Sequence, residues 1–133
     1  QNEALYSKFF KEAGLAEKSG MTEFNDKNKV LMPKSMYKKS GVRNYHIFNQ
    51  YIIRVENRDE MRAFLSANSI GSEIYYPVPF HKQECFAYLG SNASHFPVST
   101  FAAEHSIALP IFPELQEEQI AFVVEKIAEF VRK

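Results

Sequence analysis

Residues 45–55, "YHIFNQYIIRV", contain apolar side chains at alternate positions, and the predicted architecture is built around them. In an extended strand, successive side chains point to opposite faces, so residues two apart share a face. Phe48 and Ile52 would lie on one face. The opposite face would carry the larger apolar set, which is Ile47, Tyr51, Ile53 and Val55. We therefore predict a central β-strand over Tyr45–Val55.

A helix is predicted directly after this strand, in residues 57–71, "NRDEMRAFLSANSIG". Asn57 can cap the backbone amide of Glu60, and the Glu60 side chain can reach back to Asn57, which is a capping-box arrangement. A glycine follows shortly after the end of the pattern, as is common at helix C-termini. The buried stripe of this helix is predicted to be Met61, Phe64 and Leu65.

The remaining elements follow from the same two periodicities. Helices are predicted over residues 3–13, 84–89, 96–106 and 115–131, and short strands over residues 30–33, 73–76 and 107–110. The polar stretch Ala16–Lys29 is typical of a linker or a mobile insertion. Short strands interleaved with helices predict an α+β fold, with a small, mostly antiparallel sheet and helices packed on one face.

Composition favours one folded domain without a charged partner. The 133 residues, 45% of them hydrophobic, suffice for one buried core. Sixteen Lys and Arg balance sixteen Asp and Glu, so no overall field attracts nucleic acid or an anionic membrane. The basic cluster at residues 34–43 also carries Ser and Gly, as a solvated loop does. We expect neither nucleic acid nor a membrane as a partner.

The single cysteine, Cys85, excludes an internal disulfide and a zinc site built from several cysteines, which favours a cytoplasmic location. No run approaches the roughly 20 apolar residues of a membrane helix, and no signal-peptide pattern opens the sequence. Because the sequence begins at Gln1, inside a predicted helix, we expect it to be a piece of a longer protein.

Catalytic and metal-binding patterns are weak throughout the sequence. Of the four histidines, only His81 lies at helical spacing from the cysteine at position 85, and plain packing is the favoured interpretation of this pair. No glycine-rich phosphate loop and no nucleophile elbow occur. Paired carboxylates such as Glu117 and Glu118 lie at helix starts, where they interact favourably with the helix dipole. The residues by themselves therefore predict no reaction centre.

Residues 71–90, "GSEIYYPVPFHKQECFAYLG", are predicted to form a rigid connection. Pro77 and Pro79 each fix their own backbone and favour an extended conformation in the residue before them. Such a segment can line a binding pocket at low entropic cost, or it can be a stiff corner that covers the core. The residues alone favour the corner. The side chains that would serve a pocket are Tyr75, Tyr76 and His81.

Several motifs occur in a specific order: "HIFNQYIIRV", then "RDEMRAFLSANSIGSEIYYPVPFHKQECFAYLG", then "FPVSTFAAEHSIALPIFPEL" and a closing amphipathic helix. This order resembles the C-terminal part of the DegT/DnrJ/StrS family of nucleotide-sugar aminotransferases. The resemblance covers Val30–Lys133, and the helix at Glu3–Ala13 resembles the end of the segment that joins the family's two domains. Tyr75 stands where the family commonly has His.

The resemblance implies a pyridoxal-phosphate enzyme of fold type I, similar to aspartate aminotransferase. Residues 1–29 would be an interdomain helix and polar linker, and residues 30–133 the C-terminal small domain. The implied parent enzyme transfers an amino group to a nucleotide-linked keto-sugar, in polysaccharide or amino-sugar biosynthesis. In the family, the Schiff-base lysine and the phosphate cup belong to the large domain. This chain is therefore expected to be inactive alone and to bind no pyridoxal phosphate by itself.

The implied partners are the large domain of the same enzyme, a nucleotide-sugar substrate, and a second subunit in a homodimer of the parent. The resemblance implies no catalytic, cofactor-binding or metal-binding residue in this chain. His81 would bind or orient the substrate rather than transfer a proton. The residues implied in substrate binding are Tyr75, Tyr76, Pro77, Pro79, His81 and Gln83. The alternative is a freestanding module that binds a small molecule or a protein.

Overall fold

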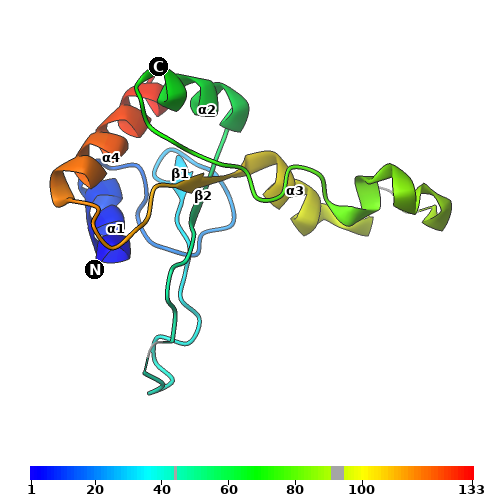
Figure 1. Ribbon diagram of the computed structural model, residues 1–133, viewed down its shortest axis with the longest axis horizontal. Helices are drawn as coiled ribbons and strands as arrows, with labels where there is room; N and C mark the ends of the chain where they lie inside the picture. The colour runs from blue at the N-terminus through cyan, green and yellow to red at the C-terminus, as the bar shows by residue number, and fades with distance from the viewer. Residues whose placement is uncertain (44, 91–94) are drawn as a thin grey trace.

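The computed structural model describes residues 1–43, 45–90 and 95–133. Within them, three strands form an antiparallel sheet in the order β1-β2-β3 (Figure 1). The strands are β1 (Val30–Leu31), β2 (Tyr51–Val55) and β3 (Ser106–Leu109). β2 is central because it pairs with both of the others, so the prediction of a central strand in this stretch is confirmed.

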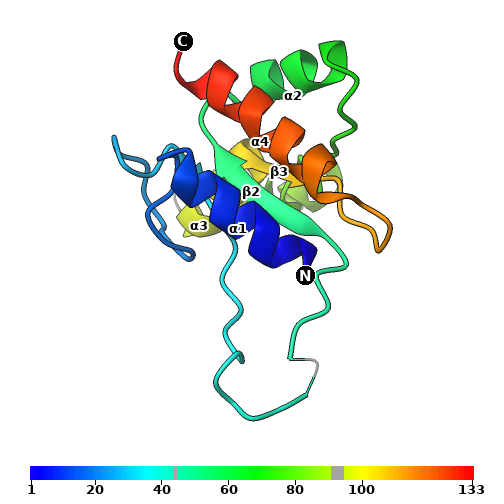
Figure 2. The ribbon, with the colours of Figure 1, turned by 90° about the vertical axis from the view of Figure 1, so that its left-hand side faces the viewer.

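Helices cover one face of this sheet (Figure 2). They are α1 (Asn2–Glu12), α2 (Arg58–Ala67) and α4 (Glu117–Val131), and α4 packs against both of the others. The predicted α+β class, with a small antiparallel sheet and helices on one face, is confirmed. In the part of the chain that the structure describes, none of the helices combines the length and the apolar character needed to span a bilayer.

The core lies between β2 and these three helices. β2 buries Tyr51, Ile53 and Val55 completely, whereas Ile52 and Arg54 on its other face are only partly buried. The helical residues packed on the buried face include Phe10 of α1, Met61 and Leu65 of α2, and Ile120, Val123 and Ile127 of α4. Each such side chain contributes about 1.5–3 kcal/mol through burial, so the stability of the domain comes mainly from one side of the sheet.

Two stacked tyrosines join α1 to the sheet. The ring centroids of Tyr6 and Tyr51 lie 4.7 Å apart with their planes inclined by 14°. The Tyr6 hydroxyl donates a hydrogen bond to the carbonyl oxygen of Pro110 at 2.8 Å. Burial raises the pKa of both hydroxyls above the usual tyrosine value, because it disfavours the charged form. α1 is therefore part of the core, and the domain boundary after residue 29 stays a prediction.

The prediction of a strand over Tyr45–Val55 is wrong for residues 45–50, because β2 begins at Tyr51. Ladder pairing begins only at Tyr51, because the neighbouring strand β3 ends at the partner residue Leu109. Backbone groups without a neighbouring strand gain nothing from extension, so the chain before β2 leaves the sheet. Phe48 has a φ of 47°, and Ile47, predicted to face the core, is 79% exposed.

The strand predicted over residues 73–76 is also wrong. Only Glu73 pairs with the sheet, through an isolated antiparallel bridge to Ala108 of β3. The Ala108 N–H donates to the Glu73 carbonyl at 2.7 Å, and the Glu73 N–H donates to the Ala108 carbonyl at 3.2 Å. Pro77 follows closely and has no backbone N–H to donate, which limits the pairing to this one bridge.

The capping box predicted for Asn57 and Glu60 is wrong. Asn57 has left-handed backbone angles, φ 51° and ψ 44°, and its side chain makes no capping hydrogen bond. A capping side chain reaches the first helical turn from an extended backbone, which this conformation does not provide. Instead, the Met61 N–H donates to the Asn57 carbonyl at 3.0 Å and closes the first turn.

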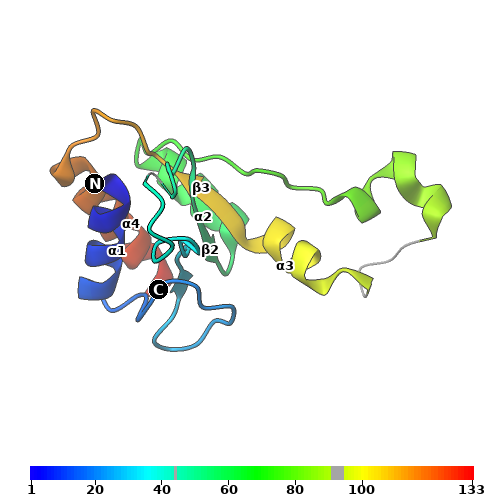
Figure 3. The same ribbon diagram turned by 90° about the horizontal axis from the view of Figure 1, so that it is seen from below.

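An arm extends from the sheet on the side away from α1 and α4 (Figures 1 and 3). It consists of two 3₁₀ helices, η1 (Phe80–Lys82) and η2 (Glu84–Leu89), and of α3 (Pro97–His105), which leads back into β3. Helices were predicted at residues 84–89 and 96–106, and both are present. Neither η1 nor η2 contains a buried residue, so the arm is held mainly where it joins the sheet.

The stretch Ala16–Lys29, predicted as a linker or mobile insertion, is a loop folded onto α3. Ala16 and Asn28 form an antiparallel bridge, and the Asn28 side chain is buried. The ring of Phe24 lies against two rings of α3, with centroids 5.6 Å from Phe101 and 5.4 Å from His105. These contacts attach the loop to the arm side of the sheet.

Arg58, at the start of α2, fixes the junction of α3 with β3. Its side chain is 8% exposed, and its Nη1 donates to the carbonyl oxygens of Ala103 at 2.9 Å and Ser106 at 3.1 Å. Its Nε forms an ion pair with Asp59 at 2.6 Å. A cation at the C-terminal end of α3 supplies donors to carbonyls without a helical partner and complements the helix dipole.

Replacing Arg58 therefore tests what anchors the arm. We expect Arg58→Ala to lower the free energy of unfolding by about 2–4 kcal/mol, because two buried carbonyls lose a charged donor. Arg62→Ala is the matched control on the same helix. It removes an exposed pair with Glu73 at 3.0 Å and should cost less than about 1 kcal/mol. Urea denaturation measures both, and equal losses would contradict the anchoring role.

Candidate functional site

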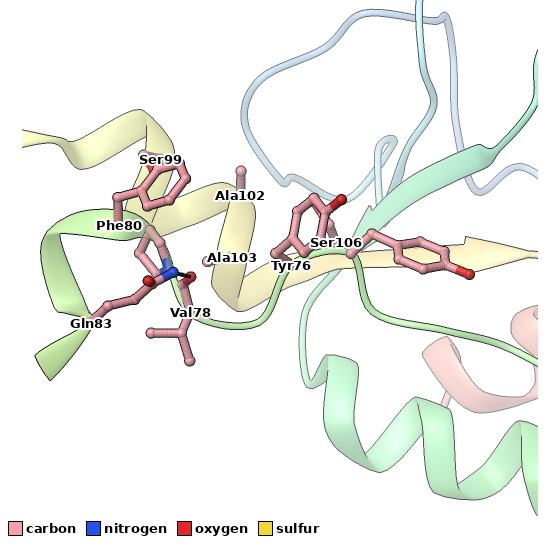
Figure 4. Close-up of a pocket in the computed structure, with 10 residues that line it drawn as sticks. Tyr76, Val78, Phe80, Gln83, Ser99, Ala102, Ala103 and Ser106 are labelled. Carbon is pink, nitrogen blue, oxygen red and sulfur yellow. Dashed lines mark hydrogen bonds between the residues drawn. The ribbon is translucent and has the colours of Figure 1, made fainter. Parts of the chain in front are cut away.

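The arm and the residues that precede it enclose a cavity of about 580 Å³ (Figure 4). One wall is the segment of residues 75–83, which contributes Tyr75, Tyr76, Val78, Pro79, Phe80 and Gln83. The other wall is α3 with the first residue of β3, which contributes Ser99, Ala102, Ala103 and Ser106. We call this space the aromatic cavity. It lies on the sheet face opposite α1 and α4.

Local sequence explains why the first wall is rigid. Pro79 has an extended backbone, with φ −70° and ψ 153°, and it directly precedes η1. The Lys82 N–H then donates to the Pro79 carbonyl at 2.9 Å. The Gln83 side chain reaches back across the turn and donates from Nε2 to the Val78 carbonyl at 3.3 Å (Figure 4). Prolines and this cross-turn hydrogen bond limit the conformations of the wall, as predicted for the segment.

The second wall is recessed because α3 presents small side chains. Ala102 and Ala103 occupy little volume where the helix faces the turn, which leaves the space that the cavity occupies. Pro97 stands in the first turn of α3, where its fixed φ is suited to a helix start. The position of this wall depends on Arg58, which binds the carbonyl oxygens of two lining residues, Ala103 and Ser106.

The structure brings four of the six predicted substrate-binding residues together and places two elsewhere. Tyr75, Tyr76, Pro79 and Gln83 line the aromatic cavity, whereas Pro77 and His81 are not among its lining residues. The role of all six residues in substrate binding stays a prediction. Sequence reasoning missed the lining residues Val78, Phe80, Ser99, Ala102, Ala103 and Ser106. In residues 96–106, helical spacing places Phe96, Ser99 or Thr100, and Ala103 on one face, but it does not indicate which residues that face contacts.

His81 bridges η1 and α3. Its Nε2 lies 3.1 Å from Oγ1 of Thr100, within hydrogen-bond distance, and its ring centroid lies 4.9 Å from that of Phe96. Cys85, which was considered as its metal-binding neighbour, is exposed. In the described part of the chain, no cluster of three metal-ligating side chains occurs. His81 thus connects η1 to α3 and is not among the residues that line the aromatic cavity.

The lining of the aromatic cavity combines ring faces with uncharged polar groups. Its polar groups are the tyrosine and serine hydroxyls and the Gln83 amide, and none of its lining residues carries a formal charge. Pyridoxal phosphate requires a lysine amine for its imine and cationic or amide donors for its phosphate. The lining residues of this cavity offer no lysine or arginine, so they do not fit that cofactor. A ring that stacks on tyrosine or phenylalanine fits them better.

Comparison with known sequences places the chain in a family. Residues 17–128 match the sequence model of the DegT/DnrJ/EryC1/StrS aminotransferase family. This match covers well over half of the chain, and the chain therefore belongs to this family. The predicted resemblance is confirmed.

Two curated relatives illustrate the similarity. A pleiotropic regulatory protein of Geobacillus stearothermophilus is 51% identical over 88 residues, which are 66% of this chain and 24% of that protein. A UDP-N-acetyl-3-dehydro-alpha-D-glucosamine 3-aminotransferase of Acidithiobacillus ferrooxidans is 43% identical over 89 residues, which are 67% of this chain and 22% of that protein. The matched part of this chain thus spans about a quarter of the length of these relatives.

Solved structures show the same relationship. The crystal structure of S. venezuelae DesV in complex with a ketimine intermediate gives a TM-score of 0.71 at 25% identity, covering 99% of this chain and 31% of that one. A family aminotransferase from Brucella abortus gives a TM-score of 0.69 at 26% identity, covering 99% of this chain and 30% of that one. The fold corresponds to just under a third of each of these aminotransferase chains.

The bridging role of His81 can be measured by hydrogen exchange. We expect His81→Ala to speed amide exchange at Lys82 and Gln83 about fivefold, because loss of one hydrogen bond favours local opening of the turn. Glu84→Gln changes an exposed neighbour and should leave these rates unchanged. Unaltered exchange in His81→Ala would show that the contact with Thr100 does not hold the wall.

Proposed function

We propose that this chain is the C-terminal small domain of a pyridoxal-phosphate-dependent aminotransferase that acts on nucleotide-linked keto-sugars. Such an enzyme serves polysaccharide or amino-sugar biosynthesis, and we expect it to work in the cytoplasm. Family membership supports the class of reaction, and two of its relatives are named for amination of a nucleotide-linked sugar or for a bound ketimine. The observation that supports a role of this chain in substrate binding is the aromatic cavity. One of its walls is the segment of residues 75–83, which lies within the motifs that resemble the family.

In this proposal the chain binds and positions substrate, while another part of the parent performs the chemistry. Pyridoxal phosphate supplies an electron sink for amino-group transfer, and we place it in the large domain. The aromatic cavity then forms part of the sugar-nucleotide pocket. Tyr76 and Phe80 provide ring faces for a base or sugar, and the Gln83 amide and the Ser99 hydroxyl provide hydrogen bonds. Residues 1–29 would lead from the large domain into residues 30–133.

Exposed apolar side chains on the arm support a larger assembly. Tyr76, Phe80, Tyr88 and Val98 are each at least 75% exposed, and they lie on or beside an arm with little buried surface. Contiguous exposed apolar groups mark surfaces that a partner covers. We propose that the large domain of the parent, in one subunit or across a homodimer, covers this arm.

A hybrid enzyme tests the proposed function. In it, the segment of the A. ferrooxidans aminotransferase that matches this chain is replaced by the corresponding residues of this chain, which is 43% identical there. We expect the hybrid to show the visible absorbance of bound pyridoxal phosphate and to aminate a UDP-linked 3-keto-sugar. This chain alone should show neither property.

Substitutions in the hybrid locate the pocket. Tyr76→Ala should raise the KM for the nucleotide sugar about tenfold with a smaller change in kcat, because it removes a stacking surface from substrate binding. Tyr88→Ala is the control, since it removes an equally exposed tyrosine of η2 that does not line the cavity. A folded, cofactor-loaded hybrid without transaminase activity would contradict the proposal and favour a freestanding binding module.

A further inference from the structure

A second cavity, of about 400 Å³, lies on the same open face of the sheet. It carries two cationic side chains, Arg54 and Lys34, and two hydroxyl groups, Thr22 and Ser106. Its remaining walls come from Gly20 and Met21 of the loop, from β1 and the residues after it, and from Ile52. None of its lining residues is acidic. We call this space the basic cavity.

The basic cavity adjoins the aromatic cavity. Ser106, the first residue of β3, lines both of them. Arg54 lies directly opposite Ser106 in the antiparallel register, and Leu31 of β1 lies opposite Arg54 on its other side. These three residues therefore form one row across the sheet, on the face that α1 and α4 leave uncovered. A ligand with a ring in the aromatic cavity could reach the basic cavity across Ser106.

Arg54 is a half-buried cation without an anionic partner among the residues that the structure describes. Its guanidinium makes no ion pair or hydrogen bond with any of them, and its contact is with the ring face of Phe101, at 5.8 Å from Cζ to the centroid. A partly buried charge is costly unless it is paired, and a guanidinium matches carboxylate and phosphate groups well. An aromatic contact on one side leaves its N–H donors available to the cavity.

Lys34 is exposed, and its stem passes close to a glycine. A Cβ atom added at Gly20 would lie 2.6 Å from Cδ of Lys34 and 2.9 Å from its Cβ, so the lysine stem runs closely across this residue. Gly20 also has a φ of +81°, which side chains other than glycine rarely adopt. Its N–H donates to the Met32 carbonyl at 2.9 Å, which fixes the loop against the chain after β1. The lysine stem thus lies at the cavity rim, beside the loop.

The loop that forms this rim is itself anchored. Phe24 packs on Phe101 and His105 of α3, and Phe101 is also the residue that Arg54 contacts. Two charged groups of the neighbouring arm, Lys82 and Glu104, are paired with each other at 3.1 Å. Among the described residues, no ion pair involves Arg54 or Lys34.

We propose that the basic cavity binds the anionic oxygens of a ligand, a phosphate or a carboxylate group, through Arg54 and Lys34. The inference deepens the proposed function and rests on it only for the identity of the ligand. In a sugar aminotransferase, the anion is either the diphosphate of the nucleotide sugar or a carboxylate of the amino-acid donor. Two cations and two hydroxyls around one space can satisfy several oxygens of either group.

Calorimetric titration of the 133-residue chain with inorganic pyrophosphate and, separately, with glutamate tests this site. For whichever of the two probes the basic cavity binds, we expect a dissociation constant of about 1 mM, a value typical of a few charged hydrogen bonds. Arg54→Met and Lys34→Met should each weaken binding at least about tenfold. Lys39→Met is the matched control, because it removes one lysine of the same basic cluster that does not line the cavity. Circular dichroism confirms that each variant is folded.

The outcomes separate the possibilities. Binding of pyrophosphate that depends on Arg54 and Lys34 identifies the phosphate group, and such binding of glutamate identifies the carboxylate. No heat from either probe at about 10 mM, or equal weakening in Lys39→Met, overturns the inference. If the chain binds a probe through Arg54 and Lys34 but the hybrid enzyme is inactive, the proposed function is contradicted and the anion site is not. An active hybrid in which Arg54→Met changes no KM would contradict the site alone.

Discussion

The structure depends on the complete burial of one side of its central strand. β2 places Tyr51, Ile53 and Val55 against α1, α2 and α4, while Ile52 and Arg54 lie on the other face and are only partly buried. Strong burial on one face fixes the register, because a shift by one residue would exchange the two sets. The second face is less completely packed at β2, although Leu31 and Ala108 beside it are buried, and both cavities lie on it. Stability and binding are thus assigned to opposite faces of the same strands.

The arm links these two faces. α3 has few contacts with the sheet, and the Arg58 side chain reaches from α2, on the buried side, to the carbonyls that end α3. The same carbonyls belong to residues that line the aromatic cavity. Arg58 of α2 therefore supports the aromatic cavity although it does not line it. This explains how a cation with no place in the binding surface can matter for its shape.

Much of the fold was predictable from residue periodicity, because α1, α4 and β2 each bury one face against the core. The partners of a strand are less predictable, because no local pattern encodes them. Residues 45–50 and 74–76 were predicted as strand, but they have no neighbouring strand to pair with. The motif order identified the family and four lining residues of the aromatic cavity. The basic cavity could not be predicted, since Gly20, Lys34, Arg54 and Ser106 meet only through the fold. The basic cluster at residues 34–43 is typical of a solvated loop, and its composition does not indicate that Lys34 lines a cavity.

We expect substrate to bind on the open face of the sheet, and a crystal structure of the hybrid aminotransferase with a bound UDP-sugar would locate it. The ligand should contact Tyr76 or Gln83 in the aromatic cavity, and an anionic group of a substrate should lie within hydrogen-bond distance of Arg54. A substrate that contacts only the large domain, or that touches this chain on the helical side at α1 or α4, would contradict binding on the open face.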